Sequence, residues 1–220
     1  MKTMMKASGI AYLLIFISGF YANFAILETL VDFHQPKETT LTIIANPNLY
    51  RNGLLGFLVM LISDVFLIGS LYKVTQPAHK KLSYWASLFR GIHALFFTVA
   101  LGHLFKVYKI TSSAVDSSEI YISIINYLTK FDTLWTIGLL FFAVHLLLLG
   151  YLLFRSSYGS KGMGLLLILA SFGYCIDGFS KLFLTSYSDY QPYFEIIVIS
   201  TAVVGELSFT IWLFIKGFSK

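Results

Sequence analysis

The sequence predicts an all-α, polytopic membrane protein: a bundle of six transmembrane helices with the N- and C-termini both in the cytoplasm. Three observations support this fold class. Hydrophobic residues make up 57% of the 220 residues and charged residues only 12%, with a mean hydropathy of +0.75, whereas a soluble domain is far more polar. The apolar residues gather in segments long enough to cross a bilayer as helices. The basic residues stand at the ends of these segments.

The six predicted spans are each about 19 to 27 residues long, and a helix that rises ~1.5 Å per residue then covers the ~30 Å of hydrocarbon. They run from Ala7 to Val31, Leu54 to Tyr72, Leu82 to Tyr108, Asp132 to Phe154, Met163 to Leu184 and Tyr193 to Ile215. No low-complexity tract or linker divides the chain. We therefore expect residues 1–220 to form a single transmembrane domain.

Basic residues are distributed unequally between the two sides of the predicted bundle. One side carries both termini and the connections after the second and fourth spans, and it holds no acidic residue. Its basic residues are Lys2, Lys6, Lys73, Lys80, Lys81, Arg155, Lys161, Lys216 and Lys220. The other side mixes acidic with basic residues. Because lysine and arginine accumulate on the cytoplasmic side, both termini are predicted to be cytoplasmic, and the net charge of +5 requires no nucleic-acid partner.

The connections on the two sides differ in length. QPAHKK and RSSYGSKG, on the basic side, are short and turn-like, so each joins two spans in an antiparallel hairpin. The connections on the other side are longer and contain TLTIIANPNLY and IYISIINYLTKF, in which apolar residues recur at helical spacing. We expect these two segments to form short helices or caps in the outer interface of the membrane, because they are too short to cross it.

Ionisable residues inside the spans share one depth. Counted from the basic residue at the cytoplasmic end of each span, four of them lie nine or ten residues in: Asp64, Arg90, His145 and Glu206. This distance corresponds to about 14 to 15 Å of helix. His93 lies one turn above Arg90 on the same face. A charge at this depth costs at least a few kcal/mol unless it is paired or hydrated, so these five residues are predicted to form an intramembrane polar cluster.

Three interpretations of this cluster stay open: a ligand site, a proton site or a structural core. Asp64 and Arg90 fit a structural ion pair between the second and third spans, or a substrate site. Glu206 fits a hydrogen-bonded carboxylic acid, a proton relay or a general base. A second, outer polar group lies close enough to the opposite interface to be solvated: Glu28, His103, Asp132, Asp177 and Lys181.

No metal site and no cofactor are predicted. His93 and His145 are the candidate ligands for a metal or haem, but the chain has no HxxxH or HExxH spacing that would place two imidazoles on one helical face. The single Cys175 excludes an intramolecular disulfide and a multi-cysteine metal cage. No Walker loop, GxGxxG or nucleophile elbow occurs either.

Several sequence blocks stand out beyond their composition. They are Asp64 followed by LY at 71–72, FR at 89–90, FFAVHLLLLGYLLFRS at 141–156, GY at 173–174 with Asp177, and ELSFTIWLFIKGF at 206–218. This order resembles the bacterial integral-membrane family catalogued as domain of unknown function 4386, from the second span onward.

The resemblance implies a multi-pass protein of the bacterial cytoplasmic membrane with no established activity. It favours as site residues the five that match the family pattern: Asp64, Arg90, His145, Asp177 and Glu206. Family members commonly carry a carboxylate or an amide at the position of His93.

From these features we expect an integral membrane protein that binds a lipid or a small molecule, or that assists another protein. The lack of a catalytic signature disfavours an enzyme. One alternative is a proton-coupled small-solute transporter, which needs a water path from the outer polar group to the cluster. Another is a metal-dependent intramembrane hydrolase acting on lipid. Gly69, Gly91, Gly102 and Gly173 allow close helix approach within the chain or between copies, so a homo-oligomer and a partner subunit both stay open.

Overall fold

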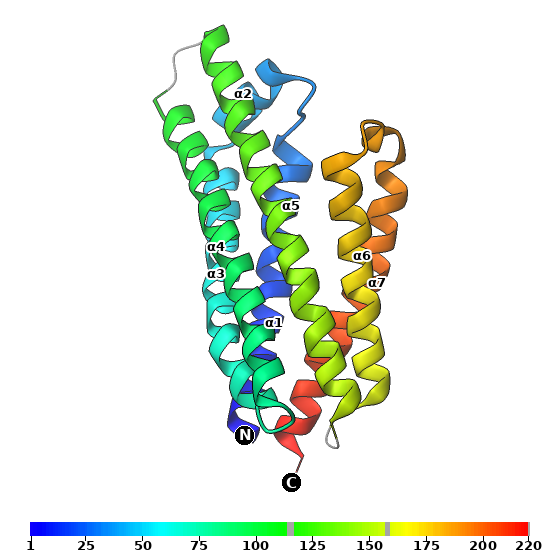
Figure 1. Cartoon of the computed structure of the whole chain (residues 1–220). Coiled ribbons are helices and arrows are strands. Elements are labelled where there is room, and N and C mark those ends of the chain that lie inside the picture. Colours follow the sequence, from blue (N-terminus) through cyan, green and yellow to red (C-terminus); the bar gives the residue numbers. More distant parts are fainter. Residues whose placement is uncertain (114–116, 157–158, 220) are drawn as a thin grey trace. The chain divides into compact units, whose positions relative to one another are not determined.

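The chain is folded entirely into helices and their connections throughout the part that the computed structural model describes, residues 1–113, 117–156 and 159–219. Figure 1 shows their order. The helices are α1 (Lys2–Ala22), which continues into the π-helix η1 (Asn23–Glu28), α2 (Pro36–Ala45), α3 (Pro47–Thr75), α4 (Lys80–Thr111), α5 (Ser118–Arg155), α6 (Lys161–Phe183) and α7 (Tyr187–Phe218).

Six of these helices are long and apolar enough to cross a membrane: α1 with η1, α3, α4, α5, α6 and α7. The prediction of an all-α bundle with six spans is therefore confirmed. Most helices extend a few residues past the predicted spans, because hydropathy identifies the apolar part of a helix and not its polar ends. Large apolar side chains such as Ile17, Leu95 and Phe172 are more than half exposed, as expected for surfaces that face lipid.

One of the two predicted outer segments is a separate helix and the other is not. TLTIIANPNLY is divided at Asn46, where α2 ends and α3 begins with Pro47. A proline fits the first position of a helix and disfavours helical backbone in the residue before it, which explains the break. IYISIINYLTKF, in contrast, forms the first turns of the 38-residue α5. The prediction of a separate interfacial helix there is wrong, because residues 118–137 contain no glycine or proline to end the helix.

The packing forms two compact units, and each is described by itself. The first comprises Met1–Leu13, Asp64–Leu95 and Thr136–Lys220. It therefore holds the start of α1, the end of α3, the start of α4, the end of α5 and all of α6 and α7. The second comprises Leu14–Ser63 and Phe96–Trp135.

The second unit has an aromatic core. The Phe97 ring of α4 lies edge-on to Trp135 of α5 at 4.6 Å between centroids, and both rings contact Phe57 of α3. Close approach of α3 to α1 depends on Gly56, where a Cβ atom would lie 2.9 Å from the carbonyl oxygen of Ser18. Aromatic contacts of this kind contribute about 0.5–1.5 kcal/mol each beyond the area they bury.

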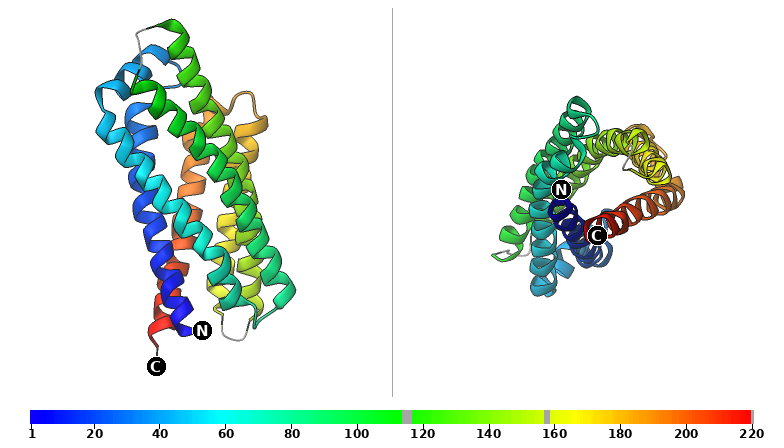
Figure 2. Two further views of the ribbon diagram at one scale, coloured as in Figure 1. Left: turned by 90° about the vertical axis from the view of Figure 1, so that its left-hand side faces the viewer. Right: turned by 90° about the horizontal axis from the view of Figure 1, so that it is seen from below.

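In the first unit the start of α1 packs against the end of α7. A Cβ atom on Gly217 would lie 3.0 Å from the backbone nitrogen of Lys6, and the Lys6 ammonium lies 4.2 Å from the centroid of the Phe218 ring. Both chain termini consequently lie at the same end of this unit, as does the turn between α3 and α4 (Figures 1 and 2). This arrangement brings the predicted basic segments together at one end, which we call the basic end.

The glycines proposed as sites of close helix approach behave differently from one another. Gly173 on α6 is such a site, since a Cβ atom there would collide with the Thr201 side chain of α7. Gly69 and Gly102 have no atom within 4 Å of an added Cβ, and Gly91 has only an ordinary contact with Ile68. Of the two alternatives that the sequence leaves open for these three glycines, close approach within the chain does not occur, and approach between copies stays a prediction. Sequence spacing does not reveal which side of a helix faces its neighbour.

The closest approach of α5 and α6 generates a stability prediction. A Cβ atom on Gly150 would lie 2.7 Å from the carbonyl oxygen of Gly164, and one on Gly164 would lie 2.6 Å from that of Gly150. Since both obstacles are backbone atoms, Gly150→Ala and Gly164→Ala should each lower the free energy of unfolding by about 1–3 kcal/mol. Reversible unfolding in mixed detergent micelles measures this.

The matched control is Gly69→Ala, also within a helix but with open space around the new methyl group. It should be neutral or stabilising by up to ~1 kcal/mol, because alanine favours the helix. Equal effects of all three substitutions would show that α5 and α6 do not approach each other in this way.

Candidate functional site

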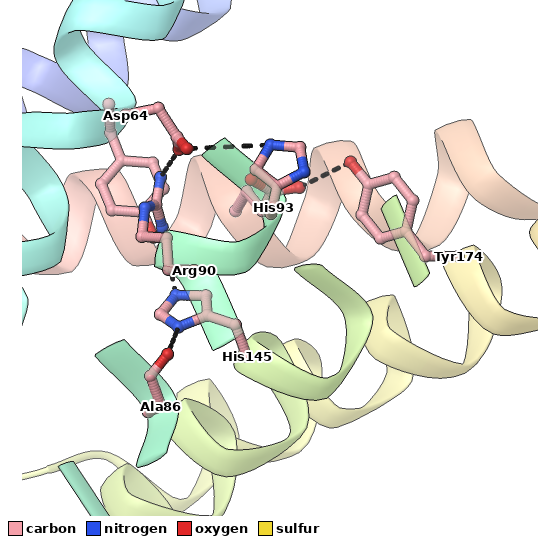
Figure 3. Close-up of polar contacts among 8 residues, drawn as sticks. Asp64, Ala86, Arg90, His93, His145 and Tyr174 are labelled. Carbon is pink, nitrogen blue, oxygen red and sulfur yellow. Dashed lines mark hydrogen bonds and ion pairs between the residues drawn. The ribbon is translucent and has the colours of Figure 1, made fainter. Parts of the chain in front are cut away.

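Arg90 lies at the centre of a buried polar cluster in the first unit. On α4 it shares one face with Ala86 and His93, and this helical spacing directs all three into the protein. Its side chain is 1% exposed. The guanidinium donates to Asp64 Oδ1 of α3 at 2.6 Å (Figure 3). It also donates to the Tyr12 hydroxyl of α1 at 2.9 Å. One arginine therefore joins three helices.

His145 of α5 supplies a further contact to the guanidinium. Its Nε2 lies 3.1 Å from Arg90 Nη1, and its Nδ1 lies 2.8 Å from the carbonyl oxygen of Ala86 (Figure 3). Arginine has only donors, so Nε2 must accept, and Nδ1 must carry the proton that it donates to Ala86. These contacts assign His145 as a neutral imidazole with its proton on Nδ1.

His93 and Phe142 complete the surroundings of the ion pair. His93 Nε2 lies 3.7 Å from Asp64 Oδ2, beyond the range of a short hydrogen bond. The Phe142 ring of α5 lies 5.3 Å from the guanidinium carbon and contacts the rings of both histidines. We call Tyr12, Asp64, Arg90, His93 and His145 the Arg90 centre. Its charged pair is enclosed by aromatic and imidazole rings.

Glu206 of α7 lies in the same unit, but its hydrogen bond goes elsewhere. Its Oε1 accepts from the Tyr174 hydroxyl of α6 at 2.9 Å, and the Glu206 side chain is almost fully buried. The Tyr174 ring packs edge-on against Phe142 at 5.5 Å, so this aromatic ring links the Glu206–Tyr174 pair to the Arg90 centre.

Two polar atoms of the Asp64–Arg90 pair form no hydrogen bond within the described part of the chain. Among the described residues, neither Asp64 Oδ2 nor Arg90 Nε has a hydrogen-bond partner, although both atoms are buried. Most buried polar atoms in proteins are hydrogen-bonded to protein or to ordered water. One acceptor and one donor of the same ion pair are thus available to a further polar group.

The structure brings together four of the five residues predicted for the cluster and adds Tyr12 to them, while the fifth, Glu206, pairs with Tyr174. Tyr12 and Tyr174 were missed because an uncharged aromatic residue in an apolar helix suggests packing and not polar contact. For Tyr12 a signal existed: it lies ten residues from Lys2, the same spacing that separates Glu206 from Lys216.

The predicted outer polar group is divided between the two units. His103 and Asp132 belong to the second unit, where the His103 ring stacks on Tyr127 at 5.8 Å. Asp177 and Lys181 belong to the first unit, where Asp177 accepts a hydrogen bond of 2.7 Å from the Tyr187 hydroxyl. Glu28 accepts a long hydrogen bond from Asn23 within η1.

The donor set does not suit a metal ion. In the described ranges no group of three or more histidine, cysteine, aspartate and glutamate side chains could hold one. Both ring nitrogens of His145 are already engaged, and a cation beside this imidazole would be repelled by the Arg90 guanidinium. His93 and His145 therefore do not form a ligand pair in this arrangement.

Six helices that are long and apolar enough to cross a membrane, together with a buried ion pair, define a polytopic α-helical membrane protein with a buried polar centre. The chain belongs to the family described as domain of unknown function DUF4386, which matches residues 7–217. It is similar to an uncharacterised protein of Archaeoglobus fulgidus, with 33% identity over 171 residues that cover 78% of this chain and 86% of that protein. No solved structure matches the chain.

Because Asp64 and Arg90 form an ion pair, replacing Arg90 alone should lower the free energy of unfolding more than replacing both residues. Arg90→Leu strands the Asp64 carboxylate in the interior, so it should lower the free energy of unfolding by about 3–5 kcal/mol. Asp64→Leu combined with Arg90→Leu removes both charges and should cost less than the single change. Unfolding in mixed micelles, or the yield of folded protein, gives the comparison. Equal losses would argue that the two residues are not partners.

The Tyr12 hydroxyl should matter more than an ordinary buried hydroxyl, because it accepts a hydrogen bond from a charged group. Tyr12→Phe should destabilise the protein by about 1.5–3 kcal/mol. Tyr50→Phe is the matched control: the Tyr50 hydroxyl is also buried but donates to the neutral carbonyl oxygen of Leu104. It should cost about 0.5–1.5 kcal/mol. A Tyr12→Phe variant as stable as wild type would contradict the assigned contact.

Proposed function

We propose that the protein binds a small polar molecule, or the polar group of a lipid, at the Arg90 centre. In this role it is a binding or accessory protein of the membrane and not an enzyme. We further propose that it resides in the bacterial cytoplasmic membrane with both termini in the cytoplasm. The orientation is supported by the nine basic residues at the termini and the two short connections.

The binding proposal rests on two buried atoms of the ion pair, Asp64 Oδ2 and Arg90 Nε, that have no hydrogen-bond partner among the described residues. A purely structural pair gains most when all of its polar atoms are satisfied, because each unsatisfied buried atom costs about 1–3 kcal/mol. Here Asp64 Oδ2 can accept a hydrogen bond and Arg90 Nε can donate one. A ligand with one donor and one acceptor, such as a hydroxyl or a carboxylic acid group, complements both atoms.

The two alternatives have less support. Proton-coupled transport is favoured by the titratable residues of the centre and by Glu206, yet transporter sites are commonly built from interrupted helices. The helices that carry these residues, α1, α3, α4, α5 and α7, run through their positions without a break. Metal-dependent hydrolysis would need a set of ligands that the described side chains do not form.

The binding proposal predicts that a ligand copurifies with the protein. Wild-type protein extracted in a mild detergent should release close to one molecule per chain on denaturation, detected by mass spectrometry of the extract. The variant with Asp64→Leu and Arg90→Leu should retain about a tenth of this or less, which corresponds to a loss of ~1.4 kcal/mol or more. Circular dichroism and gel filtration would establish that this variant is folded.

The control variant combines Ser8→Ala with Ser70→Ala. These serines form a buried hydrogen bond of 2.9 Å between α1 and α3 in the same unit, outside the Arg90 centre. The control should keep the ligand. A wild-type protein that releases no stoichiometric molecule, or a leucine variant that retains it, would refute the proposal.

A further inference from the structure

A cleft of about 360 Å³ lies at the basic end of the first unit, separate from the Arg90 centre. It is formed where the turn before α4 meets the end of α5, and its walls include His79, Leu82, Tyr151, Leu152 and Arg155. Its volume falls within the usual range for small-ligand sites. On α5, Arg155 is ten residues from His145, which corresponds to about 15 Å of helix.

Two side chains give this cleft the chemistry of an anion site. His79 Nδ1 accepts a hydrogen bond of 3.2 Å from the Leu82 backbone, so in the neutral ring the proton is on Nε2, which is left as a donor. Arg155 is exposed, with its guanidinium 5.8 Å from the centroid of the Tyr151 ring. Over the residues that the structure describes, Arg155 has no carboxylate within ion-pair distance. The Arg155 guanidinium presents several N–H donors in one plane, and no carboxylate of the described residues neutralises its charge. Such a group suits a phosphate.

The surrounding sequence adds positive charge and no negative charge. Residues 73–81 and 155–161 contain no aspartate or glutamate, whereas they include Lys73, Lys80, Lys81 and Lys161 besides Arg155. An anion in the cleft would therefore be attracted by these basic side chains, because neither segment contains a carboxylate that offsets their positive charge. Basic pockets between helices at the membrane surface are sites where anionic headgroups bind.

The remaining walls indicate the kind of phosphate. Leu82 and Leu152 are apolar, and Tyr151, which is about half exposed, presents a ring with a polar tip. The cleft stands at the ends of helices that are long and apolar enough to cross a membrane, where we expect lipid headgroups to lie. We propose that it binds the phosphate of an anionic phospholipid, with Arg155 and His79 contacting the phosphate oxygens and the leucines contacting the glycerol and acyl carbons.

The test uses the full chain, freed of lipid in a neutral detergent and titrated with phosphatidylglycerol. Native mass spectrometry counts the bound lipid. His79→Ala combined with Arg155→Gln should weaken binding about tenfold or more. The control is Arg51→Gln, which removes an exposed arginine near the other end of α3 and should bind lipid as wild type does.

Two further probes separate the sources of the phosphate. Diacylglycerol, which lacks the phosphate, should not bind in the cleft, and inorganic phosphate at the same concentration should not displace phosphatidylglycerol. Unchanged lipid affinity in the double variant, or equal binding of diacylglycerol, would overturn the proposal. Displacement of phosphatidylglycerol by inorganic phosphate would assign the cleft to a soluble phosphate and overturn the lipid assignment. The double variant leaves the Arg90 centre unaltered, so a difference in bound lipid between wild type and this variant is assigned to the cleft.

Discussion

The ion pair between Asp64 and Arg90 is the contact on which the packing of the first unit most depends. A guanidinium in the membrane interior is tolerated only where other groups replace its hydration, and here α1, α3 and α5 each contribute one such group. Apolar packing between helices in lipid has little directional preference, because lipid chains are as apolar as leucine. The polar contacts therefore fix which faces of these helices meet.

The same constraint determines the chemistry of the neighbouring side chains. Because the guanidinium offers only donors, it holds His145 as a neutral acceptor and prevents that imidazole from serving as a metal ligand. Glu206 is hydrogen-bonded to Tyr174 and not to the cation, so the centre holds one charged pair beside a separate carboxyl–hydroxyl pair.

The sequence predicts those features that depend only on position along the chain, such as the extent of a span and the depth of a residue within it. Hydropathy located the six spans, and counting residues from the basic ends placed Asp64, Arg90 and His145 at one depth. Rotation of each helix about its axis cannot be counted in this way. Sequence therefore missed the pairing of Glu206 with Tyr174 and the exposed position of Gly69. The start of α5 was misplaced for another reason: a polar residue such as Asp132 ends an apolar run without ending the helix.

The most direct test of the account is a measurement of the contact between Asp64 and Arg90 in lipid bilayers. With Arg51→Lys and Arg155→Lys, Arg90 becomes the sole arginine of the chain, and solid-state NMR can then detect dipolar coupling from its guanidinium nitrogens to labelled aspartate carboxyl carbons. The account predicts a coupling that corresponds to a nitrogen–carbon distance of about 3.5 Å. A guanidinium with no aspartate carbon within about 6 Å would contradict it.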